Sequence, residues 1–272
     1  MRRLRTRRMT ALLLIPVGLY LAAATAAYLS QTRLIFPAWM VPPAGPLPSG
    51  AERLTLNRPN GDRLEGVYLP ARVAGGGGTL MLLFSGNASN AQALAEHFAT
   101  IFPEHPVAAF HYRGYAPSTG TPGASALIED APAIHDLLAE RYRPARIIAV
   151  GISLGSGVAA QLAAQRSLAG LILVTPFDSL SAMARESYAW LPTSLLLRHE
   201  MDSVEALDGV ETPVAIIAAG RDTLIRPART AALRAAVPNL VYHHVFPHAA
   251  HNDILAQPGF DAAMRAALAA VT

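Results

Sequence analysis

Residues 146–156 read RIIAVGISLGS, a short apolar run that leads into a serine flanked by two glycines and then into small residues. The run at 147–150 has no polar alternation, which predicts a strand buried on both faces. Residues 155–166 predict the helix that follows. A sharp turn from strand to helix presents a serine hydroxyl, and glycines at 151 and 155 leave room for the neighbouring chain. The stretch therefore predicts a nucleophile at Ser153.

Working outward, the same alternation of buried runs and helical stretches continues along the chain. Further apolar runs of four or five residues stand at 80–84, 107–110, 171–174 and 214–218, and residues 240–246 predict one more strand. Helical stretches stand between and after them, at 91–102, 124–142, 227–236 and 253–270. This order predicts an α/β fold: a mostly parallel, doubly wound sheet with helices on both faces.

Two alternating segments precede that region, at 52–58 and 63–69. They are separated by Asn60-Gly61-Asp62, a turn sequence typical of hairpins. We therefore expect the sheet to begin with an antiparallel pair. Ligands of such sheets bind beyond the carboxyl ends of the parallel strands, so the residues after each apolar run are the candidates for chemistry.

A serine nucleophile needs a base, and the base needs an orienting carboxylate. In a strand–serine–helix arrangement of this kind the chain order is serine, acid, histidine. Asp222 follows the run at 214–218, and His251 follows the predicted strand at 240–246, so both fit this order. Asp178 is the competing acid, because it follows the preceding strand, and His248 is the competing base.

His243 and His244 are weaker candidates because they alternate within the last predicted strand. The negative charge that develops on a substrate oxygen needs two preorganised backbone donors. The amide of Leu154 is expected to be one, because it opens the helix after the serine. The amide of Asn87, in the loop after the run at 80–84, is expected to be the other. This chemistry requires no metal and no cofactor.

The N-terminus combines a basic start with an apolar stretch. Five arginines lie within residues 1–8, residues 9–29 carry no charge, and Arg33 is the next charged residue. About 20 helical residues cross the hydrocarbon core of a bilayer. The charge asymmetry places the N-terminus in the cytoplasm and the remainder in the periplasm or the extracellular space.

The alternative is a cleaved secretory signal and a secreted protein, since Ala22-Ala23-Ala24 and Ala24-Thr25-Ala26 are both small-x-small sites. The apolar run is longer than the core of a usual signal peptide, which favours an anchor. The predicted organisation is a basic N-terminus and signal anchor at 1–30, a Pro- and Gly-rich linker at 31–50 and one catalytic domain at 51–272.

The charge and cysteine content of the chain exclude some classes of partner and of chemistry. The formal net charge is +3, and the arginines before the apolar stretch account for it, so nucleic acid is not an expected partner. There is no cysteine, which excludes disulfides and thiol catalysis.

Several motifs together resemble the membrane-anchored α/β-hydrolases that include protein depalmitoylases and monoacylglycerol-lipase-like enzymes. The matching stretches are residues 31–37, 86–90, 112–120, 151–156, 175–180, 220–222 and 251–253. The resemblance implies Ser153, Asp222 and His251 as catalytic triad, with Asn87 and Leu154 supplying the oxyanion hole. The chain departs from the pattern at Ser85, where the family usually has histidine, at His111, where it has aspartate, and at Ala116, where it has glycine.

The expected activity is hydrolysis of carboxylic esters or thioesters through an acyl-enzyme, on small-molecule, lipid or acylated substrates. An aminopeptidase-like amide hydrolase and a catalytically silent binding module of the cell envelope are the alternatives. Residues 181–208 are expected either to form a small cap over an acyl-binding pocket or to pack as an ordinary connecting helix.

Overall fold

The computed structural model describes the backbone of residues 2–272 and the side chains of residues 14–272. An eight-stranded sheet runs through the domain in the order β1-β2-β4-β3-β5-β6-β7-β8. The strands are β1 (Glu52–Asn57), β2 (Arg63–Leu69), β3 (Thr79–Phe84), β4 (Val107–Phe110), β5 (Arg146–Ile152), β6 (Gly170–Val174), β7 (Val214–Ala219) and β8 (Leu240–Phe246). β1 and β2 are antiparallel, β2 is antiparallel to β4, and all other pairs are parallel. The predicted hairpin and mostly parallel sheet are confirmed.

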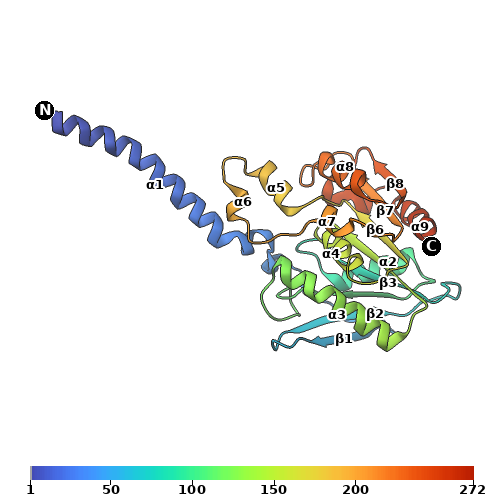
Figure 1. The fold of residues 1–272 in the computed structure, drawn as a ribbon. Coiled ribbons are helices and arrows are strands. Elements are labelled where there is room, and N and C mark those ends of the chain that lie inside the picture. The colour runs from blue at the N-terminus through green and yellow to red at the C-terminus, as the bar shows by residue number, and fades with distance from the viewer. Residues whose placement is uncertain (1) are drawn as a thin grey trace.

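Helices cover both faces of this sheet (Figure 1). α2 (Ala91–Ile101) and α9 (Phe260–Val271) pack on one face, and their buried side chains share an apolar core with β3 and β4. α3 (Ala124–Tyr142), α4 (Leu154–Ala163) and α8 (Pro227–Ala236) pack on the other. β3 to β7 are buried on both sides, which explains why they contain almost no polar residue, whereas β8 at the sheet edge is only partly buried and contains His243 and His244.

The predicted helix at 253–270 is two elements in the structure. A 3-10 helix, η2 (His251–Ala256), is followed by a turn at Pro258 and Gly259, and α9 begins only at Phe260. η2 ends at Ala256, and Gly259, the N-cap of α9, has φ of 87°, a left-handed conformation that is accessible to glycine without strain. Proline also disfavours helical backbone at the residue before it.

α1 (Arg2–Ile35) is one long helix that projects from the domain (Figure 1). Among the described residues, Leu14–Met40 is the one segment long and apolar enough to cross a membrane. The arginine side chains of residues 2–8 lie outside the residues whose side chains are described. The predicted apolar N-terminal helix is therefore present.

The segment at 31–50, predicted as an extended linker, begins differently. Its first five residues are the last turns of α1, and only after a short 3-10 helix, η1 (Ala38–Met40), is the chain extended. Gln31 and Phe36 are buried, Phe36 within the main core. Within the segment 31–50, proline and glycine occur only from residue 37 onward, so nothing in residues 31–35 stops the helix from continuing.

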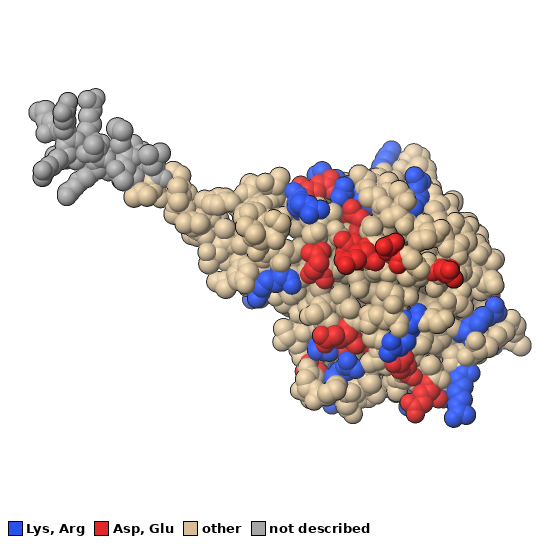
Figure 2. Space-filling view, in the orientation of Figure 1, with Lys and Arg blue, Asp and Glu red and all other residues tan. Residues whose placement is uncertain are grey.

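Between β6 and β7 lies a cap of three short helices: α5 (Leu180–Ser187), α6 (Thr193–Leu196) and α7 (Ser203–Leu207). α5 and α6 stand beside the domain end of α1, while α7 packs on α4. Figure 2 shows charged side chains distributed over the body of the domain, whereas the surface of the cap next to α1 is largely uncharged.

Candidate active site

Ser153 lies at the turn from β5 into α4. Its backbone has φ of 52° and ψ of −118°, a conformation that costs free energy for a residue with a Cβ. The two flanking glycines make the turn possible. A Cβ on Gly155 would lie 2.1 Å from the carbonyl oxygen of Phe84, and one on Gly151 would lie 2.3 Å from that of Gly155. The glycines are therefore required by close backbone approach, as the sequence predicted.

A chain of two hydrogen bonds runs from this serine. His251 Nε2 lies 2.8 Å from Ser153 Oγ, and His251 Nδ1 lies 2.6 Å from Asp222 Oδ2. The imidazole therefore bridges the hydroxyl and the carboxylate, with Nδ1–H donating to Asp222. The other carboxylate oxygen, Oδ1, accepts from the amides of Leu224 and Ile225 at 2.9 and 2.7 Å. These contacts fix the orientation of Asp222, and the side chain is only 2% exposed.

The competing residues lie elsewhere. Asp178 accepts from Arg229 Nη1 at 2.9 Å and from the amide of Ser179 at 2.8 Å, so its carboxylate serves other partners. His243 lies within β8, 3.4 Å from Arg234, and His248 is exposed in the following turn. Of the acids and bases considered from the sequence, the structure brings Asp222 and His251 to the serine.

Leu154 and Asn87, the two residues predicted to supply oxyanion-hole amides, lie beside Ser153. Leu154 opens α4, where the first amides of a helix have no partner within the helix. Asn87 lies in the loop after β3, and both residues line the same pocket as the serine. Neither amide donates to an acceptor among the described residues. Both residues therefore line the pocket with backbone amides that have no acceptor among the described residues, while their oxyanion role stays a prediction.

The side chain of Asn87 is held from two sides. Its Nδ2 donates to the carbonyl of Ile35 at 2.6 Å, and its Oδ1 accepts from the hydroxyl of Tyr115 and from the amide of Ala88. Burial is the main reason that the pKa of Tyr115 is raised. The hydroxyl consequently remains a donor.

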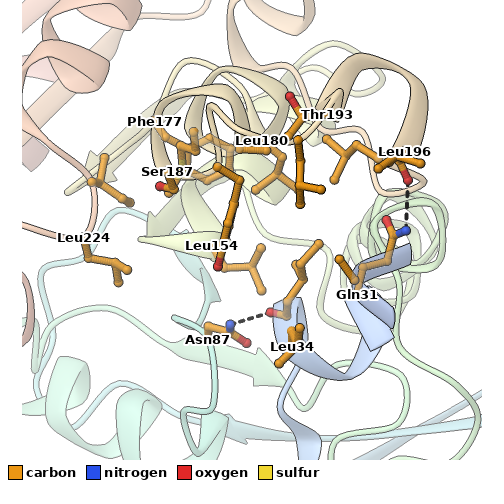
Figure 3. Close-up of a pocket in the computed structure, with 18 of the residues that line it drawn as sticks. Gln31, Leu34, Asn87, Leu154, Phe177, Leu180, Ser187, Thr193, Leu196 and Leu224 are labelled. Carbon is orange, nitrogen blue, oxygen red and sulfur yellow. Dashed lines mark hydrogen bonds between the residues drawn. The ribbon is translucent and has the colours of Figure 1, made fainter. Parts of the chain in front are cut away.

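The pocket at Ser153 has a volume of about 340 Å³, which falls within the range of ligand sites. Figure 3 shows its wall: Gln31 and Leu34 come from α1, Leu180 from α5 and Leu196 from α6. Leucine, alanine and aromatic side chains dominate the lining. None of the described residues that line it carries a charge.

The sequence did not predict that α1 contributes to this pocket. Gln31 ties the helix to the cap: its Nε2 donates to the carbonyl of Leu196 at 2.9 Å, and its Oε1 accepts from the amide of Arg198 at 2.7 Å. Thr32 Oγ1 lies 2.7 Å from His199 Nε2. The one available signal was the match of residues 31–37 to the resembled family, which lies outside the predicted catalytic domain.

Arg113, which follows β4, has a structural environment. It forms a bidentate pair with the buried Asp130, and Asp62 lies 3.7 Å away. The hydrogen bonds to Asp130 raise the pKa of the guanidinium, which stays charged in any case. Its neighbour His111 is buried, and neither ring nitrogen has a hydrogen-bond partner among the described residues.

The sheet order, the strained serine turn and the position of the histidine after the last strand together define a protein of the α/β-hydrolase fold. A family model described as alpha/beta hydrolase fold matches residues 74–200. Over 232 residues the chain is 36% identical to an uncharacterized protein of Mycobacterium tuberculosis, covering 82% of this chain and 81% of that one. The chain therefore belongs to the α/β-hydrolase superfamily.

Solved structures agree on the fold. An esterase of Pyrococcus furiosus superposes with a TM-score of 0.68 at 17% identity, covering 84% of this chain and 96% of the esterase. An alpha-beta hydrolase of Vibrio vulnificus superposes with a TM-score of 0.61 at 22% identity, covering 77% of this chain and 79% of that one. At these identities the likeness concerns the fold alone.

Proposed function

We propose that this chain is a serine hydrolase that cleaves carboxylic esters or thioesters through an acyl-enzyme. The observation that carries the proposal is the pair of hydrogen bonds, 2.8 and 2.6 Å, that links Ser153 to His251 and His251 to Asp222. A base within hydrogen-bonding reach activates a hydroxyl, and a carboxylate on its other nitrogen selects the productive tautomer.

In the first half of the reaction, His251 Nε2 takes the proton of Ser153 while Oγ attacks the acyl carbon. The carbonyl electron pair moves to oxygen, and the amides of Asn87 and Leu154 stabilise that charge. The intermediate collapses, expelling an alkoxide or thiolate that takes the proton back from His251. In the second half, His251 deprotonates a water, which attacks the acyl carbon, releases the carboxylic acid and restores Ser153. Asp222 keeps the imidazole oriented throughout.

The lining of the pocket favours an acyl group over an amino-terminal peptide. An ammonium group taken out of water needs a carboxylate partner, and the described lining residues include none. An apolar chain needs no such partner. The pocket therefore supports ester or thioester substrates ahead of the aminopeptidase-like alternative.

We also propose that α1 is retained as a membrane anchor, with the catalytic domain on the periplasmic or extracellular side. α1 passes through both small-x-small sites as continuous helix, and its last turns are bonded into the domain through Gln31 and Thr32. The arginines at its start supply the charge asymmetry.

The test is active-site labelling of the full chain in detergent with a fluorophosphonate, read by intact mass, beside Ser153→Ala. We expect one adduct on the wild type and none on the variant. Hydrolysis of p-nitrophenyl acetate, lost in the variant, then establishes the ester reaction. The absence of an adduct on folded wild-type protein would reject an activated serine and leave the binding-module alternative.

A further inference from the structure

The segment that follows α5 and includes α6 exposes apolar side chains to solvent. Residues 188–197 read YAWLPTSLLL and carry no charge, although Glu186 precedes them and Arg198 follows. We call this segment the cap tip. Its side chains are unusually exposed for their type: Tyr188 is 51%, Trp190 56% and Leu195 82% exposed. Large apolar side chains exposed close together in this way indicate a site of interaction with a protein or a membrane.

Contacts with α1 indicate which partner this is. The hydroxyl of Tyr20 donates to the carbonyl of Trp190 at 3.2 Å, and the two rings meet edge to face with centroids 6.3 Å apart. Tyr20 lies within the uncharged stretch at 9–29. Leu29 lies nine positions after Tyr20, about 14 Å along the helix. If α1 crosses a bilayer, the cap tip that touches Tyr20 lies within the same bilayer.

The residues flanking this region suit a membrane interface. The guanidinium of Arg33 lies 4.8 Å from the centre of the Trp39 ring, and that of Arg198 lies 4.8 Å from the centre of the Tyr28 ring. Aromatic rings and arginines collect where hydrocarbon meets water. Both pairs lie on the domain side of the Tyr20 contact. Along α1 toward the domain, an apolar surface is therefore followed by one suited to the membrane interface and then by one suited to water.

We propose that the cap tip is embedded in the bilayer beside α1, and that the pocket of Ser153 takes the acyl chain of a membrane-resident ester or thioester from that bilayer. The pocket lies between these two elements: Ala27 and Leu34 line it from α1, and Tyr188 and Leu191 from the cap tip. An acyl chain that moves along α1 would reach Ser153 without crossing water. The inference rests on the proposed function for the identity of the reacting group.

The membrane position of the cap tip can be measured directly, because the chain has only two tryptophans. Trp39→Phe leaves Trp190 as the single emitter in the full chain, reconstituted in phosphatidylcholine vesicles. We expect blue-shifted emission that is quenched when the acyl chains of the lipid are brominated. Emission typical of water would overturn the proposal. Blue-shifted emission without quenching would also overturn it, because the cap tip would then be covered by protein, such as a second copy.

The acyl path is tested by filling the pocket from its α1 wall. Ala27→Trp places a large ring at the lining, whereas Leu29→Trp, two residues on, places the same ring on a side chain that is 70% exposed and outside the pocket. We measure kcat/KM for p-nitrophenyl laurate and p-nitrophenyl acetate in vesicles. Ala27→Trp should lower the laurate-to-acetate ratio by about tenfold, and Leu29→Trp should leave it unchanged.

Fluorophosphonate labelling of Ser153 in Ala27→Trp shows that the site is still assembled. An unchanged ratio in a labelled Ala27→Trp protein would overturn the acyl path while leaving the proposed hydrolase intact. Absence of labelling and of acetate hydrolysis in the wild type would instead reject the proposed function itself.

Discussion

The side-chain amide of Asn87 donates a hydrogen bond of 2.6 Å to the carbonyl of Ile35, the last residue of α1. The last carbonyls of a helix have no partner within it, so this bond satisfies an otherwise free acceptor. It also connects the loop that carries a proposed oxyanion donor to the apolar N-terminal helix (Figure 3). α1 is therefore part of the structure that positions the candidate site.

Asn87→Ala keeps the backbone amide but removes the bonds that hold its loop to Ile35 and Tyr115. We expect kcat for an ester to fall about tenfold with little change in KM, less than the loss on deleting an oxyanion donor outright. Asn90→Ala is the matched control. Asn90 caps α2 through the amide of Ala93, so its loss should lower stability and leave kcat near the wild-type value. Equal losses of kcat in both variants would remove the positioning role.

Asp222→Asn tests the assignment of the acid. The amide cannot select the imidazole tautomer that leaves Nε2 free to accept a proton, so we expect kcat to fall by about 10⁴. Asp178→Asn is the control, because its carboxylate pairs with Arg229 and lies outside the hydrogen-bonded chain to Ser153. Steady-state ester hydrolysis measures both. A larger loss for Asp178→Asn than for Asp222→Asn would reverse the assignment.

Phe36→Ala tests whether the segment after α1 belongs to the folded domain. The ring is 1% exposed and packs edge to face on His199. Removing a buried phenylalanine costs about 3–5 kcal/mol. At about 2–4 °C per kcal/mol for a domain of this size, the melting temperature in detergent should fall by about 10 °C. Leu29→Ala, which removes an exposed side chain of α1, should not change it. Equal melting temperatures for Phe36→Ala and the wild type would show that the segment packs loosely.

The burial of His111 leads us to expect that the folded protein loses stability in mild acid. Burial, aided by the charge of Arg53, lowers its pKa to about 4. An unfolded histidine has a pKa of about 6.5, so between these values the unfolded state binds more protons than the folded state. Stability is therefore lost as pH falls through this window, by about 3 kcal/mol once pH is below 4. His111→Leu should melt with a smaller decrease between pH 7 and pH 5 than the wild type. Parallel decreases in the two proteins would contradict this.

Local sequence patterns were sufficient for the sheet and for the order of the proposed triad. Apolar runs without alternation identify strands buried on both faces, because such strands have no solvent-facing side. Gly151, Ser153 and Gly155 could be interpreted from a five-residue stretch, since the close backbone approach at the turn is a local constraint. The order serine, acid, histidine then selected Asp222 and His251 from their positions after strands.

The break before α9 was also readable in principle, because Pro258-Gly259 is a local signal. The contacts of α1 with the domain could not be predicted from local sequence signals. The apolar pattern of residues 9–29 predicts a hydrophobic helix, but it does not indicate which residues the following turns of that helix contact. Gln31 and Leu196 are 165 residues apart, and Asn87 and Ile35 are 52 apart.

The sequence by itself thus determined the sheet, the serine turn and the presence of an apolar N-terminal helix, because each depends on neighbours a few residues away. Only the tertiary structure decided that this helix continues into the domain and lines the pocket. The physical reason is that burial of apolar surface stabilises the fold whichever apolar partner covers that surface. Which partner Phe36 and Leu34 meet depends on how the cap and the loop after β3 fold around Ser153.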